Sequence, residues 1–451
     1  MSLGRSGAWR EIRKGCGGLL LACALSVHAA DPLPQPLTLE YALSLADAPH
    51  PQLQQADALV DVARAEQSRV DAIDNVKVDL ELAARLIDPS YRSQDIEPSN
   101  NDSWAKLRIH KQLYDFGRND YLTEAADAQF RGRQLDLLNV RQQRRLEVTA
   151  RYFDVLLADL EQARDTEAMA IAFVRLDRAR SRNELGQLSD IDLLELESRY
   201  QELLRRQRAS QAKQRASRSR LALSLNLPDQ LPSDLEFPVL SALQRPPGEV
   251  EPLEDAALAD NPELRALREA VAAARKRTEA ARAGNGAVIR GEIQGAAYNR
   301  SLGSSDPFVA GLVLDVPLST GGALEAEAAR NRALMRQKQA QLAARELEVR
   351  QTVLDLWLEL QTLDARRREL ESLGEFRELD FDRSRTLYEL EATSDLGDAM
   401  TRISEVRLLQ AQTDFKTALA WARLDALTGR LIGAPAEARP QAPNGAGSDT
   451  E

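Results

Sequence analysis

The sequence predicts a mainly α-helical fold with a small β part, in which long helices form a tube and strands from several copies form a barrel. Three observations predict it. Two segments are far longer than helices of a globular core, four shorter segments alternate apolar and polar residues, and this pattern occurs twice in 451 residues. The composition, 43% hydrophobic and 29% charged, is typical of a folded chain.

The N-terminus has the pattern of a bacterial export signal. Basic side chains precede a short apolar core over residues 17–27, and Val27-His28-Ala29 places small residues where a signal peptidase cleaves. We therefore expect residues 1–29 to be removed. An alternative stays open, because Leu20-Leu21-Ala22-Cys23 resembles a lipoprotein box, which would leave an acylated Cys23.

Similar motifs recur in two halves of the chain. Leu113–Gly117 (LYDFG) recurs as Leu318–Gly322 (LSTGG), and Pro51-Gln52-Leu53 recurs as Pro262-Glu263-Leu264. The repeat predicts the following division: a signal peptide over 1–29, a first repeat over 30–227, a Pro-rich joint over 228–252, a second repeat over 253–432 and a disordered tail over 433–451.

Each half is expected to open with a helix, which in the first half runs from about Thr38 to Asp74. Its counterpart begins at Asn261-Pro262-Glu263, where Asn caps the helix, Pro fits the first turn and Glu faces the positive end of the dipole. His50 takes the place of Asn261 in the first half, and we expect it to cap less well.

Two strands follow in each half. Within Val76–Ile87, Leu80 and Leu82 lie on one face and Asp79 and Glu81 on the other. Similar alternation covers residues 104–114, 289–297 and 308–318. The lengths approach that of a tilted strand that crosses a bilayer, although an ordinary sheet with one solvated face would alternate in the same way.

The two longest segments favour the first alternative. Asn119–Leu185 and Gly322–Leu390 contain no Pro, and as helices each would span roughly 100 Å. An isolated two-stranded coiled coil would explain them but not the strands. Four strands cannot close a barrel and open edges are not tolerated in lipid, whereas three copies would supply twelve strands around a water-filled channel.

The residues offer little for catalysis, so we expect no enzyme, no cofactor and no metal site. Without residues 1–29 the chain keeps no Cys, and of its His residues only His50 and His110. Asp115-Phe116-Gly117 resembles a kinase triplet but lacks the accompanying motifs. Gly117, Gly321 and Gly322 instead fit turns from strand to helix. The net charge of −11 disfavours nucleic acid, and no apolar run is long enough for a membrane-spanning helix.

The order of several loose motifs resembles the TolC family of outer membrane efflux proteins, over residues 37–432. The matching segments are LTLEYAL (37–43), LYDFGR (113–118), RNELGQLSDIDLLELES (182–198), NPELRAL (261–267) and VPLSTGG (316–322). The resemblance implies a homotrimer with a twelve-stranded barrel in outer-membrane lipid, four strands per chain, and a long periplasmic helical barrel, in a Gram-negative bacterium.

By the same resemblance, the protein is a passive exit duct for small molecules. It would dock a periplasmic adaptor (membrane fusion) protein and an inner-membrane pump of the RND, ABC or MFS type. Within the family, a duct for type I protein secretion or for metal-ion efflux is the alternative. A periplasmic coiled-coil scaffold is the alternative from another class of protein.

The resemblance also assigns two sets of site residues to the helical turns. The residues expected at the adaptor-docking tip are Arg182, Gly186, Ser189, Asp192, Tyr388 and Glu391. Asp395 and Asp398 are expected to form acidic rings that narrow the closed pore. A helical hairpin would need the same Gly and Ser, and both Asp side chains could instead cap the returning helix.

The signal sequence generates a direct prediction. The mature protein should begin at or near Ala30, because the cleavage pattern ends at Ala29. N-terminal sequencing or the intact mass of the exported protein would measure this. A mature chain that begins with an acylated Cys23 would contradict it.

Overall fold

A computed structural model describes residues 33–87, 101–284, 286–299, 305–390 and 395–432. The chain divides into two compact units, Met1–Pro34 and Gln35–Glu451, and all helices and strands belong to the second. The expected signal peptide, Cys23 and the expected tail over 433–451 lie outside the described residues.

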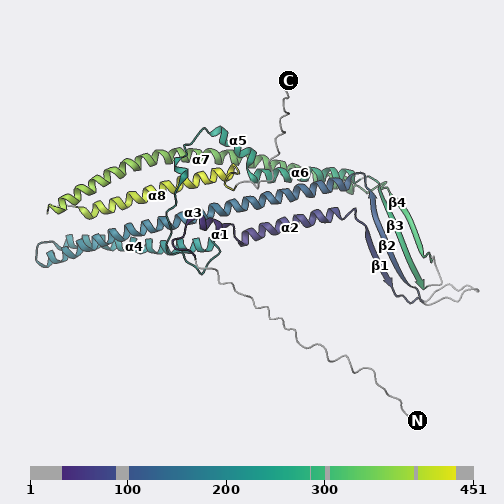
Figure 1. Cartoon of the computed structure of the whole chain (residues 1–451), viewed down its shortest axis with the longest axis horizontal. Coiled ribbons are helices and arrows are strands. Elements are labelled where there is room, and N and C mark those ends of the chain that lie inside the picture. The colour runs from purple at the N-terminus through teal and green to yellow at the C-terminus, as the bar shows by residue number, and fades with distance from the viewer. Residues whose placement is uncertain (1–32, 88–100, 285, 300–304, 391–394, 433–451) are drawn as a thin grey trace, which may run out of the picture. The chain divides into compact units, whose positions relative to one another are not determined.

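The elements of the first half are followed by similar elements in the second (Figure 1). The first half contains α1 (Leu39–Ala46), α2 (Pro51–Asp71), β1 (Lys77–Ala83), β2 (Ser103–Tyr114), α3 (Arg118–Glu184) and α4 (Asp190–Ser224). After a short 3₁₀ helix (Ser241–Gln244), the second contains α5 (Val250–Asp260), α6 (Pro262–Ala283), β3 (Val288–Asn299), β4 (Phe308–Asp315), α7 (Ala323–Glu389) and α8 (Leu396–Leu427).

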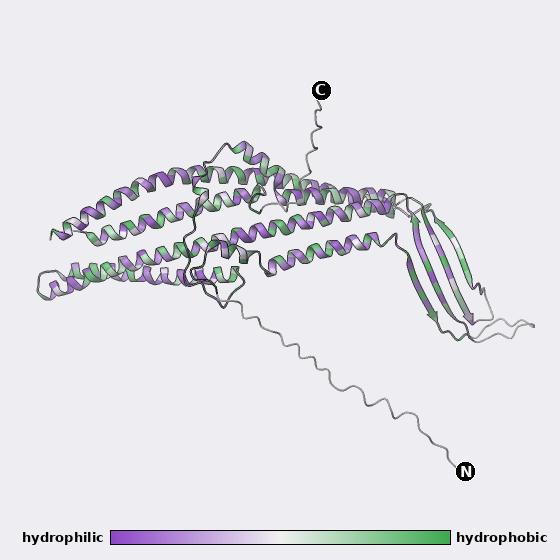
Figure 2. Ribbon diagram, in the orientation of Figure 1, coloured by the Kyte–Doolittle hydropathy of each residue, from purple (hydrophilic) through white to green (hydrophobic). Residues whose placement is uncertain are grey.

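The two long helices agree with the lengths expected from the sequence. α3 and α7 have 67 residues each, and each follows a glycine in the left-handed conformation, Gly117 at φ 85° and Gly322 at φ 86°. Gly321 also has a positive φ of 60°. Figure 2 shows hydrophilic and hydrophobic residues interspersed along both helices. Side chains with a Cβ rarely adopt these angles, so the glycines allow a strand to turn directly into a helix.

The expectation of one helix from Thr38 to Asp74 is wrong. α1 ends at Ala46 and α2 begins at Pro51, because Pro49 and Pro51 cannot donate a helical hydrogen bond and disfavour helical geometry in the preceding residue. His50 caps α2, with its Nδ1 accepting a hydrogen bond of 3.2 Å from the Gln52 amide. Asn261 caps α6 more fully, since its Oδ1 accepts bonds from two amides at 2.9 and 3.0 Å.

The helices pack side by side in two overlapping rows that share α3 and α7. The row nearer the strands in sequence is α2–α3–α6–α7, and the row of the two hairpins is α4–α3–α8–α7. The main buried cluster lies where α5, α6, α7 and α8 meet. Its largest side chains are Leu264, Leu356, Leu360, Leu424 and Trp421.

The segment expected as a Pro-rich joint is packed against the start of the described chain. The Leu37 amide donates to the Asp234 carbonyl at 2.9 Å, and the Glu236 amide donates to the Leu37 carbonyl at 3.0 Å. The hydroxyl of Tyr152, on α3, lies 2.6 Å from the carbonyl oxygens of both Leu37 and Glu236. Burial raises the pKa of Tyr152 to about 12, so this hydroxyl stays a hydrogen-bond donor.

The four strands form one antiparallel sheet in the order β1–β2–β3–β4. The register places Leu80 opposite Leu107 and Ile109 opposite Ile293. This confirms the alternation, although β1 is shorter than the expected Val76–Ile87. On the apolar face the side chains are largely exposed, and the most exposed are Val78, Leu80, Leu82, Phe308, Leu312 and Leu314.

The other face of the sheet carries ion pairs across the strands. Arg108 on β2 lies between Glu81 on β1 and Glu292 on β3, at 3.9 and 3.2 Å. His110 Nδ1 lies 3.3 Å from a carboxylate oxygen of Asp79. The charges of this face are thus largely paired within one chain, while the apolar face has no cover among the described residues.

The left-handed glycines give a stability prediction. Gly322→Ala should destabilise the fold by roughly 1–2 kcal/mol, because alanine is strained at φ 86° even where space is free. Gly248→Ala is the matched control, since its site is also open and its φ is not positive. The midpoint of thermal loss of helical circular dichroism should fall for Gly322→Ala and stay for the control; equal midpoints would contradict the assignment.

Candidate functional site

The turn between α3 and α4 is built around Gly186, which has a φ of 70°. Its amide donates to the Asn183 carbonyl and the Gln187 amide donates to the Arg182 carbonyl, both at 2.8 Å, which closes the end of α3. Ser189 caps α4: its Oγ accepts from the Asp192 amide at 3.2 Å and donates to the Asp192 carboxylate at 2.7 Å. Turn geometry therefore accounts for Gly186, Ser189 and Asp192.

The surface of this tip is apolar to a degree that the sequence motifs did not indicate. Leu185, Ile191 and Leu194 are 72, 79 and 63% exposed. At the end of α7, Tyr388 is 59% and Leu390 71% exposed. Hydrophobic periodicity could have identified them, because they lie off the face that packs in each hairpin.

Two of the expected tip residues add less. The Arg182 side chain is exposed in the last turn of α3. Glu391 lies outside the described residues, as do positions 392–394. The second turn is therefore described only from Asp395 onward.

Asp395 and Asp398 face a cation that the sequence did not point to. Arg175 on α3 lies 2.8 Å from Asp398 and 3.8 Å from Asp395. Asp395 occupies the N-cap position of α8, yet in the described chain its side chain accepts no capping hydrogen bond. Arg175 is more than 200 positions away in sequence, so only folding could bring it here.

Gly397 lets α8 approach α3 at this point. A Cβ built on Gly397 would lie 2.8 Å from Cγ2 of Ile171, closer than side chains tolerate. Ile171 and Arg175 lie one turn apart on α3, on the same face. The glycine and the ion pairs therefore hold the start of the second hairpin against the first.

Asp115 has a structural role at the junction of sheet and helices. Its carboxylate accepts from the amides of Gly117 at 3.2 Å and Asn119 at 2.8 Å, and so caps α3 from outside. Gln112 donates to both Asp115 and Asp74, and the buried Asn119 amide donates to Asp74. The resemblance to a kinase triplet is thus explained by helix capping.

Residues 253–430 match the family described as outer membrane efflux protein. The second half of this chain is an outer membrane efflux protein domain. The match covers β3, β4 and both helices of the second hairpin, with α5 and α6 before them. The protein is accordingly one of the outer membrane, and its helical part suits the periplasm.

Solved outer membrane channels have the same fold. VceC from Vibrio cholerae is 18% identical with a TM-score of 0.69, over 87% of this chain and 95% of that one. CmeC from Campylobacter jejuni is 13% identical with a TM-score of 0.72, over 87 and 86%. MtrE from Neisseria gonorrhoeae, in an open state, is 16% identical with a TM-score of 0.64, over 87 and 89%. No curated protein sequence matches the chain.

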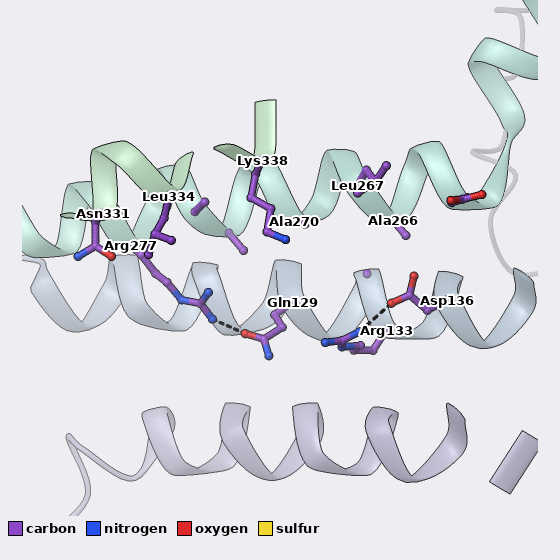
Figure 3. A pocket seen from close by; sticks show the side chains of 14 residues that line it. Gln129, Arg133, Asp136, Ala266, Leu267, Ala270, Arg277, Asn331, Leu334 and Lys338 are labelled. Atoms are coloured by element: carbon purple, nitrogen blue, oxygen red, sulfur yellow. Dashed lines mark hydrogen bonds and ion pairs between the residues drawn. The ribbon is translucent and has the colours of Figure 1, made fainter. Parts of the chain in front are cut away.

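The efflux domain and the first half together form a groove near the sheet (Figure 3). Its volume is about 490 Å³, and α6 contributes a floor of small side chains, Ala266, Ala270, Ala273 and Ala274. At its rim Arg133 pairs with Asp136 at 3.0 Å. The small side chains allow α6 to pack closely between α3 and α7.

The described part of the efflux protein offers no site for metal chemistry. No group of three His, Cys, Asp or Glu side chains in it could hold a metal ion. Among the helices that the structure describes, none is both long and apolar enough to cross a membrane. The arrangement is that of a scaffold with exposed tips, a charged contact between hairpins and a sheet with one apolar face.

Proposed function

We propose that three copies of this chain assemble into an exit duct through the outer membrane. The sheet carries this proposal. β1 and β4 are its edges, and neither pairs on its outer side with another strand that the structure describes. Lipid offers no hydrogen bonds to such edges, whereas β4 of one copy paired with β1 of the next would satisfy them.

The helical rows support the same assembly. Both rows end at α7 on one side, and at α2 or α4 on the other. Joining α7 of one copy to α2 and α4 of the next would continue the rows, and three such steps would close a ring. The helical ring would then continue the twelve-stranded barrel into the periplasm.

The duct would work without chemistry of its own. Energy would come from an inner-membrane pump, and an adaptor would bind the exposed apolar side chains of the tips, Leu185, Ile191 and Leu194. Burial of such side chains supplies the driving force for docking. Arg182 and Tyr388 lie nearby in sequence and would contribute polar and aromatic contacts at the rim.

The lipid face of the sheet can be tested with two neighbouring residues. Leu312→Arg should destabilise the assembled protein by about 2–4 kcal/mol if the site is near the bilayer midplane. Val313→Arg, on the charged face of the same strand, is the matched control and should cost far less. Unfolding titrations in bilayers and trimer mass in detergent are the measurements; equal tolerance, or a stable monomer with a folded sheet, would refute the shared barrel.

We also propose that Asp395 and Asp398 form the periplasmic constriction of this duct. Threefold symmetry would gather three copies of each around one axis, where carboxylates attract cations. Arg175 offsets part of that charge, since one guanidinium lies beside two carboxylates in each chain. The constriction would thus keep a net negative charge while its hairpins stay linked.

The gate prediction has two arms of opposite sign. Asp395→Ala combined with Asp398→Ala should lower cation selectivity and divalent block in planar-bilayer conductance. Arg175→Gln should raise cation selectivity, because it leaves both carboxylates unbalanced. Arg199→Gln, on α4 with a partner of its own in Glu202, is the control. Unchanged selectivity in variants that remain trimers would remove the gate assignment and leave the duct standing.

A further inference from the structure

Helix α4 has one face that no described part of the chain covers. Leu203, Ser210 and Ser217 recur every seven residues and are buried, which marks the face that packs on α3. Arg205, Arg208, Ala212 and Arg215 recur at intervals of three and four on the opposite side, and all are exposed. We call these four residues the arginine stripe.

The arginine stripe is strongly basic and its charges are free. From Arg199 to Arg220, α4 contains eight Arg and Lys residues and a single acid, Glu202. Arg199, Arg206, Lys213 and Arg218 pair with acids of their own chain. Arg205, Arg208 and Arg215 have no ion pair in the part of the chain that the structure describes. Uncompensated cations on a helix face favour an acidic partner.

Helix α7 has the complementary properties at the other end of the row. Between Glu369 and Asp382 it contains six acids and one base. Glu371 is exposed and pairs only with Arg367, at 3.4 Å, while Glu375 and Glu378 are exposed without an ion pair among the described residues. On the side away from α8, Leu358, Phe376 and Leu379 are 47, 55 and 71% exposed.

The two faces lie at the same height in the molecule. α3 and α7 are equally long and both start directly after a strand of one sheet, so their far ends are level. Arg208 lies 18 residues from the start of α4, and Glu371 lies 18 residues from the end of α7. Arg205 likewise corresponds to Glu375. The two helices would run antiparallel, with the opposite charges adjacent.

We propose that the arginine stripe of α4 binds the acidic face of α7 in a second copy of this chain. This inference rests on the proposed duct and adds the chemistry of its seam. Close to the tips the seam is electrostatic, with Arg205 and Arg208 facing Glu375 and Glu371. Exposed ion pairs are individually weak and weaken in salt, so the hairpins near the tip are the part of the ring that separates most readily.

Cysteine crosslinking tests the contact. Both native cysteines, Cys16 and Cys23, precede Ala30, so the mature protein offers a clean background. Ala212→Cys and Ala365→Cys, both at exposed alanines, should yield disulfide-linked oligomers of the full chain on oxidation with copper phenanthroline. Ala212→Cys with Ala343→Cys is the control, because Ala343 is also exposed but lies about 33 Å farther along α7 than Ala365.

Charge reversal tests the chemistry. In the crosslinking background, Arg205→Glu plus Arg208→Glu should lower the crosslinked fraction roughly fivefold. Adding Glu371→Arg and Glu375→Arg should restore most of it, and salt should weaken the crosslink in the wild-type background but not abolish the trimer. Circular dichroism and mass in detergent show that each variant folds and assembles.

The outcomes separate the two proposals. A trimer that gives no link between positions 212 and 365, or whose linking is indifferent to charge reversal, would overturn the arginine seam and leave the duct intact. A stable monomer would overturn the duct and the seam together. Linking restored only by the matched pair of reversals would establish the seam.

Discussion

Open edges are the constraint on which the rest of this structure depends. A four-stranded sheet leaves the backbone groups of β1 and β4 unpaired on one side, and its apolar face exposes large side chains. Either feature alone is common, but together they fit lipid around a closed ring of strands. The helical rows end in the same unfinished way, so one symmetric assembly would complete both parts.

The joints between elements show how one chain combines two such different parts. Gly117 and Gly322 turn a strand into a 67-residue helix within a few residues. Asp115 caps the first of these helices and shares hydrogen bonds with the end of α2 through Gln112. In the middle of the helical part, Tyr152 ties Leu37 and Glu236 to α3. These contacts fix the positions of the hairpins, whose far ends carry the candidate sites.

At the hairpin ends the charges are divided between contacts within the chain and faces left free. Arg175 links Asp395 and Asp398 to α3, which joins the hairpins inside one copy. The arginine stripe of α4 and the acids of α7 remain without partners in the described chain and would join hairpins of different copies. Both kinds of contact are ionic and exposed, which suits a part of the molecule that must hold closed and also separate.

The sequence by itself determined the local features of this protein. Alternation in residues such as Leu80 and Glu81 gave the strands and their faces, the absence of Pro gave the two long helices, and the ordered motifs gave the family. The break between α1 and α2 was also readable from Pro49 and Pro51, although the prediction passed over it. Contacts between distant segments could not be read in this way. Arg175 beside Asp398, Ile171 against Gly397 and the free face of α4 depend on which helix packs against which. That choice is made by the burial of whole helix faces, to which no single motif corresponds, and so only the tertiary structure decided it.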